Sequence, residues 1–279
     1  MANVRTEYEV SQKQIEVDLL NQEKKIQRYV VIGIGLALLF IVLLAVSLFK
    51  RNQFMKQTNE IIAAEKKRSD DLLKNILPEE TAKELKENGI VKAKQFEHVS
   101  VLFTDFKEFT KRSENLDPEV LVESIDFYFS KFDEIIDKYG LEKIKTIGDA
   151  YMCAGGLPFP TEDHAVKICQ AALEIIEFVR KTKRSINHKL AKFDIRIGIN
   201  TGAVVAGVVG TKKFQYDIWG DAVNTASRME SSSEVGKINI SESTYNLLKQ
   251  YDVFEFTPRG ALEAKGKGKI AMYFVEYIG

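Results

Sequence analysis

The chain has 279 residues, and its 40 basic side chains are balanced by 40 acidic ones, so its formal net charge is zero. Proteins that bind nucleic acid usually carry a basic excess, so we expect no nucleic-acid partner. The two cysteines, Cys153 and Cys169, lack the spacing of metal ligands or of a redox pair. We therefore expect no disulfide framework, and a reducing cytosol suits the larger part of the chain.

An uninterrupted apolar run occupies residues 30–49. A helix of about 20 residues is ~30 Å long, which is enough to cross the hydrocarbon core of a bilayer. A cleaved signal peptide fits less well because the run is long, follows a charged stretch and ends without a small-residue cleavage site; a buried core helix is the other alternative. Lysine and arginine are more frequent after the run than before it, which favours a cytoplasmic C-terminal part. We predict a single-pass protein of the cell (inner) membrane.

Polar, helix-prone segments flank this transmembrane run. Residues 1–29 are too few for an independent sensor domain, so we expect a short extramembrane helix. Residues 50–77 are predicted to form a charged cytosolic stalk. Within it, Met55, Ile62 and Ile76 fall on seven-residue steps, a weak coiled-coil pattern. A solvated linker helix is the alternative interpretation of the stalk.

A short helix is predicted to separate the stalk from a globular domain. Pro78 suits the first position of a helix, the two glutamates after it suit the first turn, and Gly89 suits the end. We assign residues 78–93 to a transducer helix and linker. Residues 94–279 then form one domain, whose length is ample for a hydrophobic core.

The periodicity of this domain predicts an alternation of strands and helices. The predicted helices are 118–139, 162–184 and 222–230, and the predicted strands are 98–103, 143–147, 150–154, 193–200, 203–209, 237–240 and 271–277. Two hairpins are expected, one turning at Gly148-Asp149 and one at Thr201-Gly202. The order βαββαβ predicts an α+β, ferredoxin-like sandwich with its helices on one face of the sheet.

Two aspartates stand at the ends of apolar strands. Asp105 lies at the end of the predicted strand that begins at residue 98 (98–103), and Asp149 lies at the tip of the first hairpin. Adjacent strands are ~5 Å apart, so two such carboxylates could hold a pair of hard divalent cations. The segment from Phe106 to Thr110 leads from the strand into a helix, where backbone N–H groups could receive a phosphate. Each pattern is weak alone, because aspartates are common in turns.

A more specific pattern occupies residues 215–229. Asn224 and Arg228 are four residues apart, so they project from the same face of the predicted helix. An amide and a guanidinium presented together suit a ribose and a charged phosphate. An exposed polar face without a ligand is the alternative interpretation.

Four separated motifs, in a common order and spacing, resemble the catalytic domain of class III adenylate and guanylate cyclases. They occupy residues 103–106, 143–152, 216–229 and 265–268. The resemblance covers about residues 96–277 and continues upstream, where residues 68–85 are similar to the helical segment that precedes many such domains. The chain therefore resembles a membrane-anchored, bacterial-type cyclase, and a metal-dependent phosphorus–oxygen lyase activity is implied.

The resemblance implies a role for each matching residue. Asp105 and Asp149 would hold two divalent metal ions, Mg or Mn, with the Phe106 carbonyl as a further ligand. Asn224 would orient the ribose, and Arg228 would stabilise the transition state at the α-phosphate.

Two further lysines match basic positions of the family. Lys265, on a glycine-rich loop, would bind the triphosphate. Lys212 would be a second phosphate contact at a position where the family often has arginine. A lysine there retains the positive charge, but it lacks the two parallel donors with which arginine binds a phosphate.

The choice of base is implied by Lys145 and Asp217, which match the pair typical of adenylate cyclases. Adenine offers an acceptor at N1 and a donor at its amino group, and lysine donates where aspartate accepts. ATP is therefore the expected substrate, and cyclic AMP and pyrophosphate are the expected products. A guanylate cyclase of the same fold and an inactive membrane dimerisation module are the alternatives; no diguanylate cyclase signature is present.

In the family, the metal aspartates come from one subunit and the base-selecting and transition-state residues from the other. This sequence carries both sets, which implies a homodimer with two equivalent, shared active sites.

Overall fold

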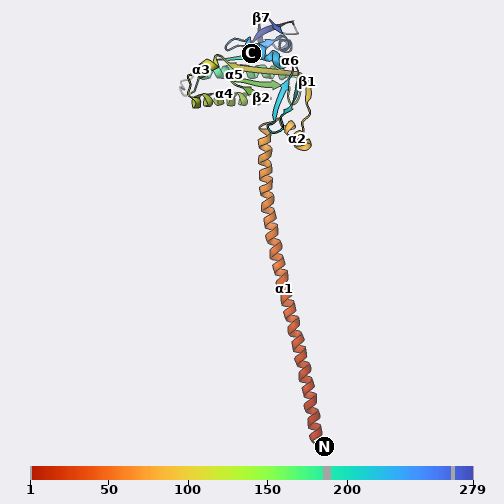
Figure 1. Ribbon diagram of the computed structural model, residues 1–279. Coiled ribbons are helices and arrows are strands. Elements are labelled where there is room, and N and C mark those ends of the chain that lie inside the picture. Colours follow the sequence, from red (N-terminus) through yellow and green to blue (C-terminus); the bar gives the residue numbers. More distant parts are fainter. Residues whose placement is uncertain (1, 185–189, 265–267, 279) are drawn as a thin grey trace. The chain divides into compact units, whose positions relative to one another are not determined.

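The computed structural model describes residues 2–184, 190–264 and 268–278, and the chain divides into two units, Met1–Asp71 and Leu72–Gly279. The described residues of the first unit all belong to one continuous helix, α1 (Ala2–Lys74), whose last three residues are part of the second unit (Figure 1). This helix is long and apolar enough to cross a membrane, and its large apolar side chains between residues 30 and 49 are exposed. It runs without a break across the predicted boundaries at residues 29 and 49, so those boundaries stay predictions.

The predicted stalk is helical as far as Lys74, where α1 ends. The residue before a proline disfavours helical backbone, which accounts for the end of α1 just before Leu77-Pro78. Met55 and Ile62 are exposed on α1, whereas Ile76 lies beyond its end. The coiled coil therefore stays a prediction. The expected short helix is confirmed as α2 (Glu79–Asn88), which ends at Gly89 in the left-handed conformation.

An eight-stranded sheet forms the centre of the second unit, with the order β2-β3-β1-β4-β6-β8-β7 and β5 paired to β4. The strands are β1 (Lys94–Phe106), β2 (Glu142–Ile147), β3 (Ala150–Gly155), β4 (Ile195–Val209), β5 (Gln215–Trp219), β6 (Ile238–Ser241), β7 (Phe254–Ala264) and β8 (Gly268–Tyr277). The remaining helices are α3 (Phe109–Ser113), α4 (Pro118–Lys138), α5 (His164–Arg184), α6 (Asp221–Ser231) and α7 (Glu242–Leu248).

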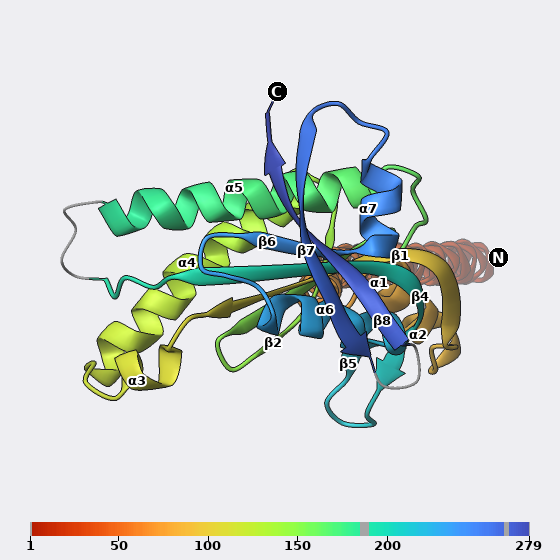
Figure 2. The same cartoon turned by 90° about the horizontal axis from the view of Figure 1, so that it is seen from above.

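The predicted βαββαβ order is confirmed in β1-α4-β2-β3-α5-β4. Helices α4 and α5 lie side by side on one face of the sheet (Figure 2). Leu102 and Phe106 of β1 point into this layer, and Phe106 sits among aromatic rings of α4, with Phe129 stacked at 6.0 Å. Burial of such aromatic surface stabilises this core together with the aliphatic side chains around it.

Helices also cover the opposite face, so the expectation of helices on one face only was wrong. Val101 and Phe103 of β1 alternate with the residues of the first core and pack with Ala222 and Ala226 of α6. Ala82 of α2 belongs to the same second core. The reason is that β1 is apolar on both faces, which a strand buried on both sides requires.

The second predicted hairpin was also wrong. Residues 195–209 form one long strand, and Thr201 and Gly202 pair with Ser100 and Val99 of β1 instead of turning the chain. Gly202 serves close packing here, because a Cβ added to it would lie 3.1 Å from the Cβ of Ala222. The chain turns further on, and the second half of β4 pairs with β5, which the sequence did not reveal as a strand.

Candidate active site

The two predicted metal aspartates lie next to each other. Ile147 pairs with Ala150, so Gly148 and Asp149 are the two-residue turn of the β2–β3 hairpin, and Gly148 has the positive φ of 63° that such turns favour. Thr104 pairs with Tyr151, which brings Asp105 beside that turn. The predicted proximity of Asp105 and Asp149 is therefore present in the structure.

The electrostatics of this carboxylate pair fit a divalent cation. Burial, followed by the negative charge of Asp105 and a hydrogen bond with it, raises the pKa of Asp149, while the backbone N–H groups of Asp149 and Phe106 counteract the rise. Two like charges held together raise each other's free energy, and a bound cation relieves that repulsion. Among the described residues, no three or more His, Cys, Asp or Glu side chains are arranged so that they could hold a metal ion together. Backbone, water and phosphate oxygens would have to complete the coordination of an ion such as Mg²⁺.

Two residues that sequence reasoning missed adjoin this pair. Arg196 of β4 is the cross-strand partner of Asp105, and its Nη2 lies 2.6 Å from Asp105 Oδ2. The same Nη2 lies 3.0 Å from Glu230 Oε1 at the end of α6, as a charge contact without hydrogen-bond geometry. The pKa of Glu230 is raised to about 7, mainly by burial; the charge of Arg196 opposes this rise, and the charges of Asp105 and Asp149 add to it. The only signal in the sequence was an arginine inside an apolar strand, since the register between strands cannot be read from it.

The two predicted base-selecting residues form an ion pair. Lys145 on β2 and Asp217 on β5 are joined by a Nζ–Oδ2 distance of 2.5 Å. Asp217 is buried, and its second oxygen, Oδ1, accepts the N–H of Ile218 at 2.8 Å. The structure thus brings a donor-only and an acceptor-only side chain together from strands far apart in the sequence.

The predicted helix 222–230 is α6, and it presents Asn224 and Arg228 on its exposed side. Of the three residues between them, Thr225 and Ala226 are buried and face the sheet together with Met229, whereas Ser227 is exposed. Both polar side chains are therefore available to a ligand from outside this chain.

The other predicted site residues are placed as follows. The Phe106 side chain is buried, so only its main chain is available to an ion. Thr110 is exposed in α3, and its carbonyl accepts from the Ser113 hydroxyl. Lys212 lies in the exposed turn between β4 and β5, and Lys265 lies outside the described residues.

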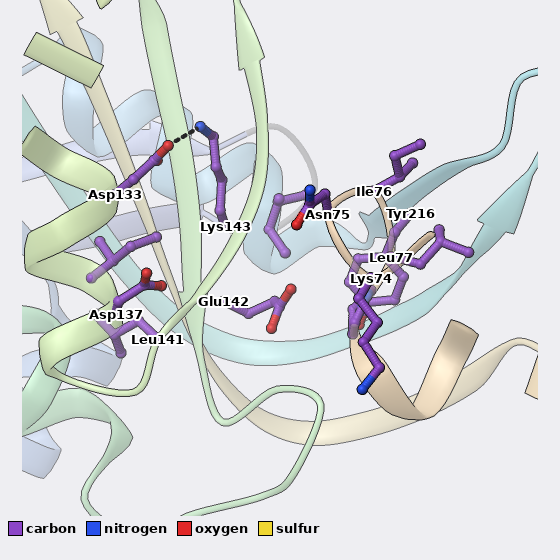
Figure 3. A pocket seen from close by; sticks show the side chains of 13 residues that line it. Lys74, Asn75, Ile76, Leu77, Asp133, Asp137, Leu141, Glu142, Lys143 and Tyr216 are labelled. Atoms are coloured by element: carbon purple, nitrogen blue, oxygen red, sulfur yellow. Dashed lines mark hydrogen bonds and ion pairs between the residues drawn. The ribbon is translucent and has the colours of Figure 1, made fainter. Parts of the chain in front are cut away.

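A hollow of about 560 Å³ lies beside β2, and the described site residues do not line it (Figure 3). Its walls include Asp133, Asp137, Glu142, Tyr216 and the segment from Lys74 to Pro78. Figure 3 shows Glu142 projecting from β2 towards Leu77 and Tyr216. Burial, followed by the negative charge of Asp137, raises the pKa of Glu142 to about 7.

This raised pKa predicts a pH-dependent stability. The folded chain favours the neutral form of Glu142, so stability is lost as the pH rises from the ordinary carboxyl range through about 7. We expect Glu142→Gln to raise the melting temperature relative to the unchanged chain at pH 8 and to leave it nearly equal at pH 4.5. Thermal unfolding at both pH values measures this. The exposed Glu255→Gln on β7 is the control, and equal behaviour of Glu142→Gln and the unchanged chain at pH 8 would contradict the assignment.

Comparison with known proteins identifies relatives. Residues 91–277 match the family "Adenylate and Guanylate cyclase catalytic domain". The chain is 42% identical over 217 residues to an adenylate cyclase of Mycobacterium tuberculosis, covering 77% of this chain and 48% of that protein. It is 38% identical over 232 residues to guanylate cyclase soluble subunit beta-2 of Rattus norvegicus, and this match covers 83% of this chain and 34% of that protein. The chain thus spans about half or less of the length of these relatives.

A solved structure is similar as well. It is the catalytic core of a rhodopsin-guanylyl cyclase with converted specificity, in complex with ATPαS, and it is 38% identical to this chain. The match has a TM-score of 0.62 and covers 67% of this chain and 99% of that one. The fold of residues 91–277 is therefore one that binds purine nucleotides in a related protein.

Proposed function

Because the chain belongs to the family of adenylate and guanylate cyclase catalytic domains, we propose that it converts ATP into 3′,5′-cyclic AMP and pyrophosphate. Relatives of both substrate classes are similar to it, so the choice of ATP rests on one observation. That observation is the contact between Lys145 and Asp217, which offers one donor and one acceptor side by side.

The pair suits adenine and opposes guanine. Adenine presents an acceptor at N1 beside a donor at its amino group, which Lys145 and Asp217 can satisfy after exchanging their mutual bond for bonds to the base. Guanine presents a donor at N1 and an acceptor at O6, so each side chain would meet a like group. A buried polar group without a partner costs roughly 1–3 kcal/mol, so two mismatches favour ATP by at least about tenfold.

The reaction is an intramolecular phosphoryl transfer. The ribose 3′ oxygen bonds to the α-phosphorus, the bond from that phosphorus to the bridging oxygen breaks, pyrophosphate leaves, and the hydroxyl proton passes to solvent. Asp105 and Asp149, with the Phe106 carbonyl, would hold two divalent cations, Mg or Mn. Cations bound there supply charge neutralisation on the triphosphate and lower the pKa of the 3′ hydroxyl.

The remaining proposed roles concern positioning and charge. Asn224 orients the ribose, and Arg228 stabilises the charge that develops on the α-phosphate. Lys265 and Lys212 bind the triphosphate, and Thr110 in the first turn of α3 is a further contact with it. No side chain is assigned as the general base.

We further propose a homodimer with two shared active sites. Its support in the structure is an exposed apolar surface on the β4–β5 hairpin, which a second copy would cover. Val205 and Trp219 are cross-strand partners there with exposed fractions of 38% and 41%, and Val209 and Phe214 are exposed on the same hairpin. The exposed Asn224 and Arg228 would then reach the carboxylate pair of the partner copy. The helix α1 would anchor the dimer to the cell membrane, with the catalytic domains in the cytoplasm.

Substrate choice gives the first test of this function. The full chain, assayed with ATP and GTP and with Mg²⁺ and Mn²⁺, is expected to form cyclic AMP with a kcat/KM at least about tenfold above that for cyclic GMP. Lys145→Glu combined with Asp217→Cys removes the adenine-matched pair and should shift the ratio towards GTP. A preference for GTP by the unchanged chain would instead support a guanylate cyclase. An unchanged ratio in the double variant would place base recognition elsewhere.

Complementation tests the shared site. Asp105→Ala and Asn224→Ala chains should each be nearly inactive alone, because each lacks a part of both sites. In a mixture, one site of a mixed dimer regains every part, so up to about a quarter of the unchanged activity should return at equal amounts. Mixing two batches of Asp105→Ala is the control and should restore nothing. Absence of any recovery in mixed dimers, shown by co-purification, would refute the shared site.

A further inference from the structure

The helix that carries Asn224 and Arg228 depends on the sheet for its position. α6 has 11 residues, and Gly220 at its N-terminus provides no side-chain cap. Isolated helices of this length are marginal in water, so tertiary contacts must hold it. These contacts determine where its exposed face, and with it the two functional side chains, comes to lie.

Two glycines of β4 allow α6 to approach the sheet backbone closely. A Cβ added to Gly198 would lie 1.8 Å from the N of Glu230, and one added to Gly202 would lie 3.1 Å from the Cβ of Ala222. Four residues of strand span about 13 Å and eight residues of helix about 12 Å, so the two spacings match. α6 therefore runs antiparallel to β4, with each end seated on a glycine.

Two buried asparagines bind α6 at these same ends. The Asn200 Nδ2 of β4 donates to the carbonyl oxygen of Ala222 at 2.9 Å, and the Asn239 Nδ2 of β6 donates to that of Met229 at 2.8 Å. Asn239 is also the cross-strand partner of Gly198. The Met229 carbonyl belongs to the last turn of α6, where carbonyls lack partners within the helix. Each end of α6 thus has a glycine below it and an amide bound to it.

The orientation of the Asn200 amide is fixed by two hydroxyls. Ser241 and Ser243 donate to its Oδ1 at 2.7 Å and 3.0 Å. A carbonyl such as that of Ala222 can only accept, so the nitrogen must face α6. The amide is therefore held in the orientation that binds the helix.

In the part of the chain that the structure describes, Asn239 has an unpaired buried oxygen that lowers the stability of the fold, so stability does not explain why an asparagine stands at this position. It is fully buried, and its Oδ1 has no hydrogen-bond partner among the described residues. An unpaired buried oxygen is unfavourable, and an apolar residue of similar volume would avoid it. The bond from its nitrogen to α6 is what an apolar residue could not provide.

We propose that Asn200 and Asn239 are positioning residues, which hold α6 at its two ends and so set the placement of Asn224 and Arg228 for the reaction. The expected effect of the two asparagines on turnover rests on the proposed cyclase function. Their expected effect on the position of α6 rests on the geometry alone. Displacement of reacting groups by about 1 Å can cost about a hundredfold in rate, so loosening one end of α6 is expected to affect turnover strongly.

Asn239→Leu separates positioning from stability. It removes the bond to Met229 together with the unpaired oxygen, so the melting temperature should stay the same or rise. The kcat for ATP should nevertheless fall at least about tenfold, with KM changed less than about threefold. Asn200→Ala, the second variant, should lower kcat similarly. The control is Ser124→Ala, which removes a buried hydroxyl of α4 bonded to the Val120 carbonyl, and it should lower the melting temperature without changing kcat.

Hydrogen exchange of the full chain tests, independently of activity, whether Asn200 and Asn239 hold α6. Amides of residues 222–231 should exchange at least about tenfold faster in Asn239→Leu and Asn200→Ala, while those of α4 keep their rates. Unchanged exchange in α6, or an unchanged kcat in Asn239→Leu, would overturn the proposal. If the unchanged chain forms no cyclic nucleotide, the cyclase function fails, and exchange in α6 still decides whether the asparagines hold the helix.

Discussion

The candidate site depends on the pairing of β1 with two neighbours at once. β1 lies between β3 and β4, so the end of β1 places Asp105 beside the turn that carries Asp149 on one side and beside Arg196 on the other. Neither contact is local in sequence, and both follow from the antiparallel register. A shift of this register by one residue would turn Asp105 to the opposite face of the sheet and separate the three charges.

The charges gathered by this pairing favour a cation. Three carboxylates, those of Asp105, Asp149 and Glu230, repel one another, and the Arg196 guanidinium contacts two of them, Asp105 and Glu230. The pKa values of Asp149 and Glu230 are raised, which is the response of acids that are partly buried beside one another. A bound divalent cation would relieve the repulsion between these carboxylates, whereas a neutral ligand would not. The same constraint explains why α6 must end close to β4, since its last turn supplies Glu230.

The sequence was sufficient for features that depend on local pattern. The Gly148-Asp149 hairpin, the helix bearing Asn224 and Arg228, and the βαββαβ order all followed from periodicity and turn residues. Features that depend on pairing between distant segments were not accessible. Thr201-Gly202 resembles a turn, yet β1 continues to pair with β4 through it, and the glycine serves the approach of α6. Arg196, Asn200 and Asn239 escaped notice for the same reason, because their partners are set by strand register and by helix packing.

The proposed reaction requires Asp105 and Asp149 to act together as a cation site. Electron paramagnetic resonance of Mn²⁺, with the full chain and a non-hydrolysable ATP analogue, counts the ions bound per nucleotide. We expect two for the unchanged chain and a loss of both affinity and count in Asp149→Asn. Equal Mn²⁺ binding by the unchanged chain and by Asp149→Asn would show that the carboxylate pair does not hold the ions, and it would contradict the proposed chemistry.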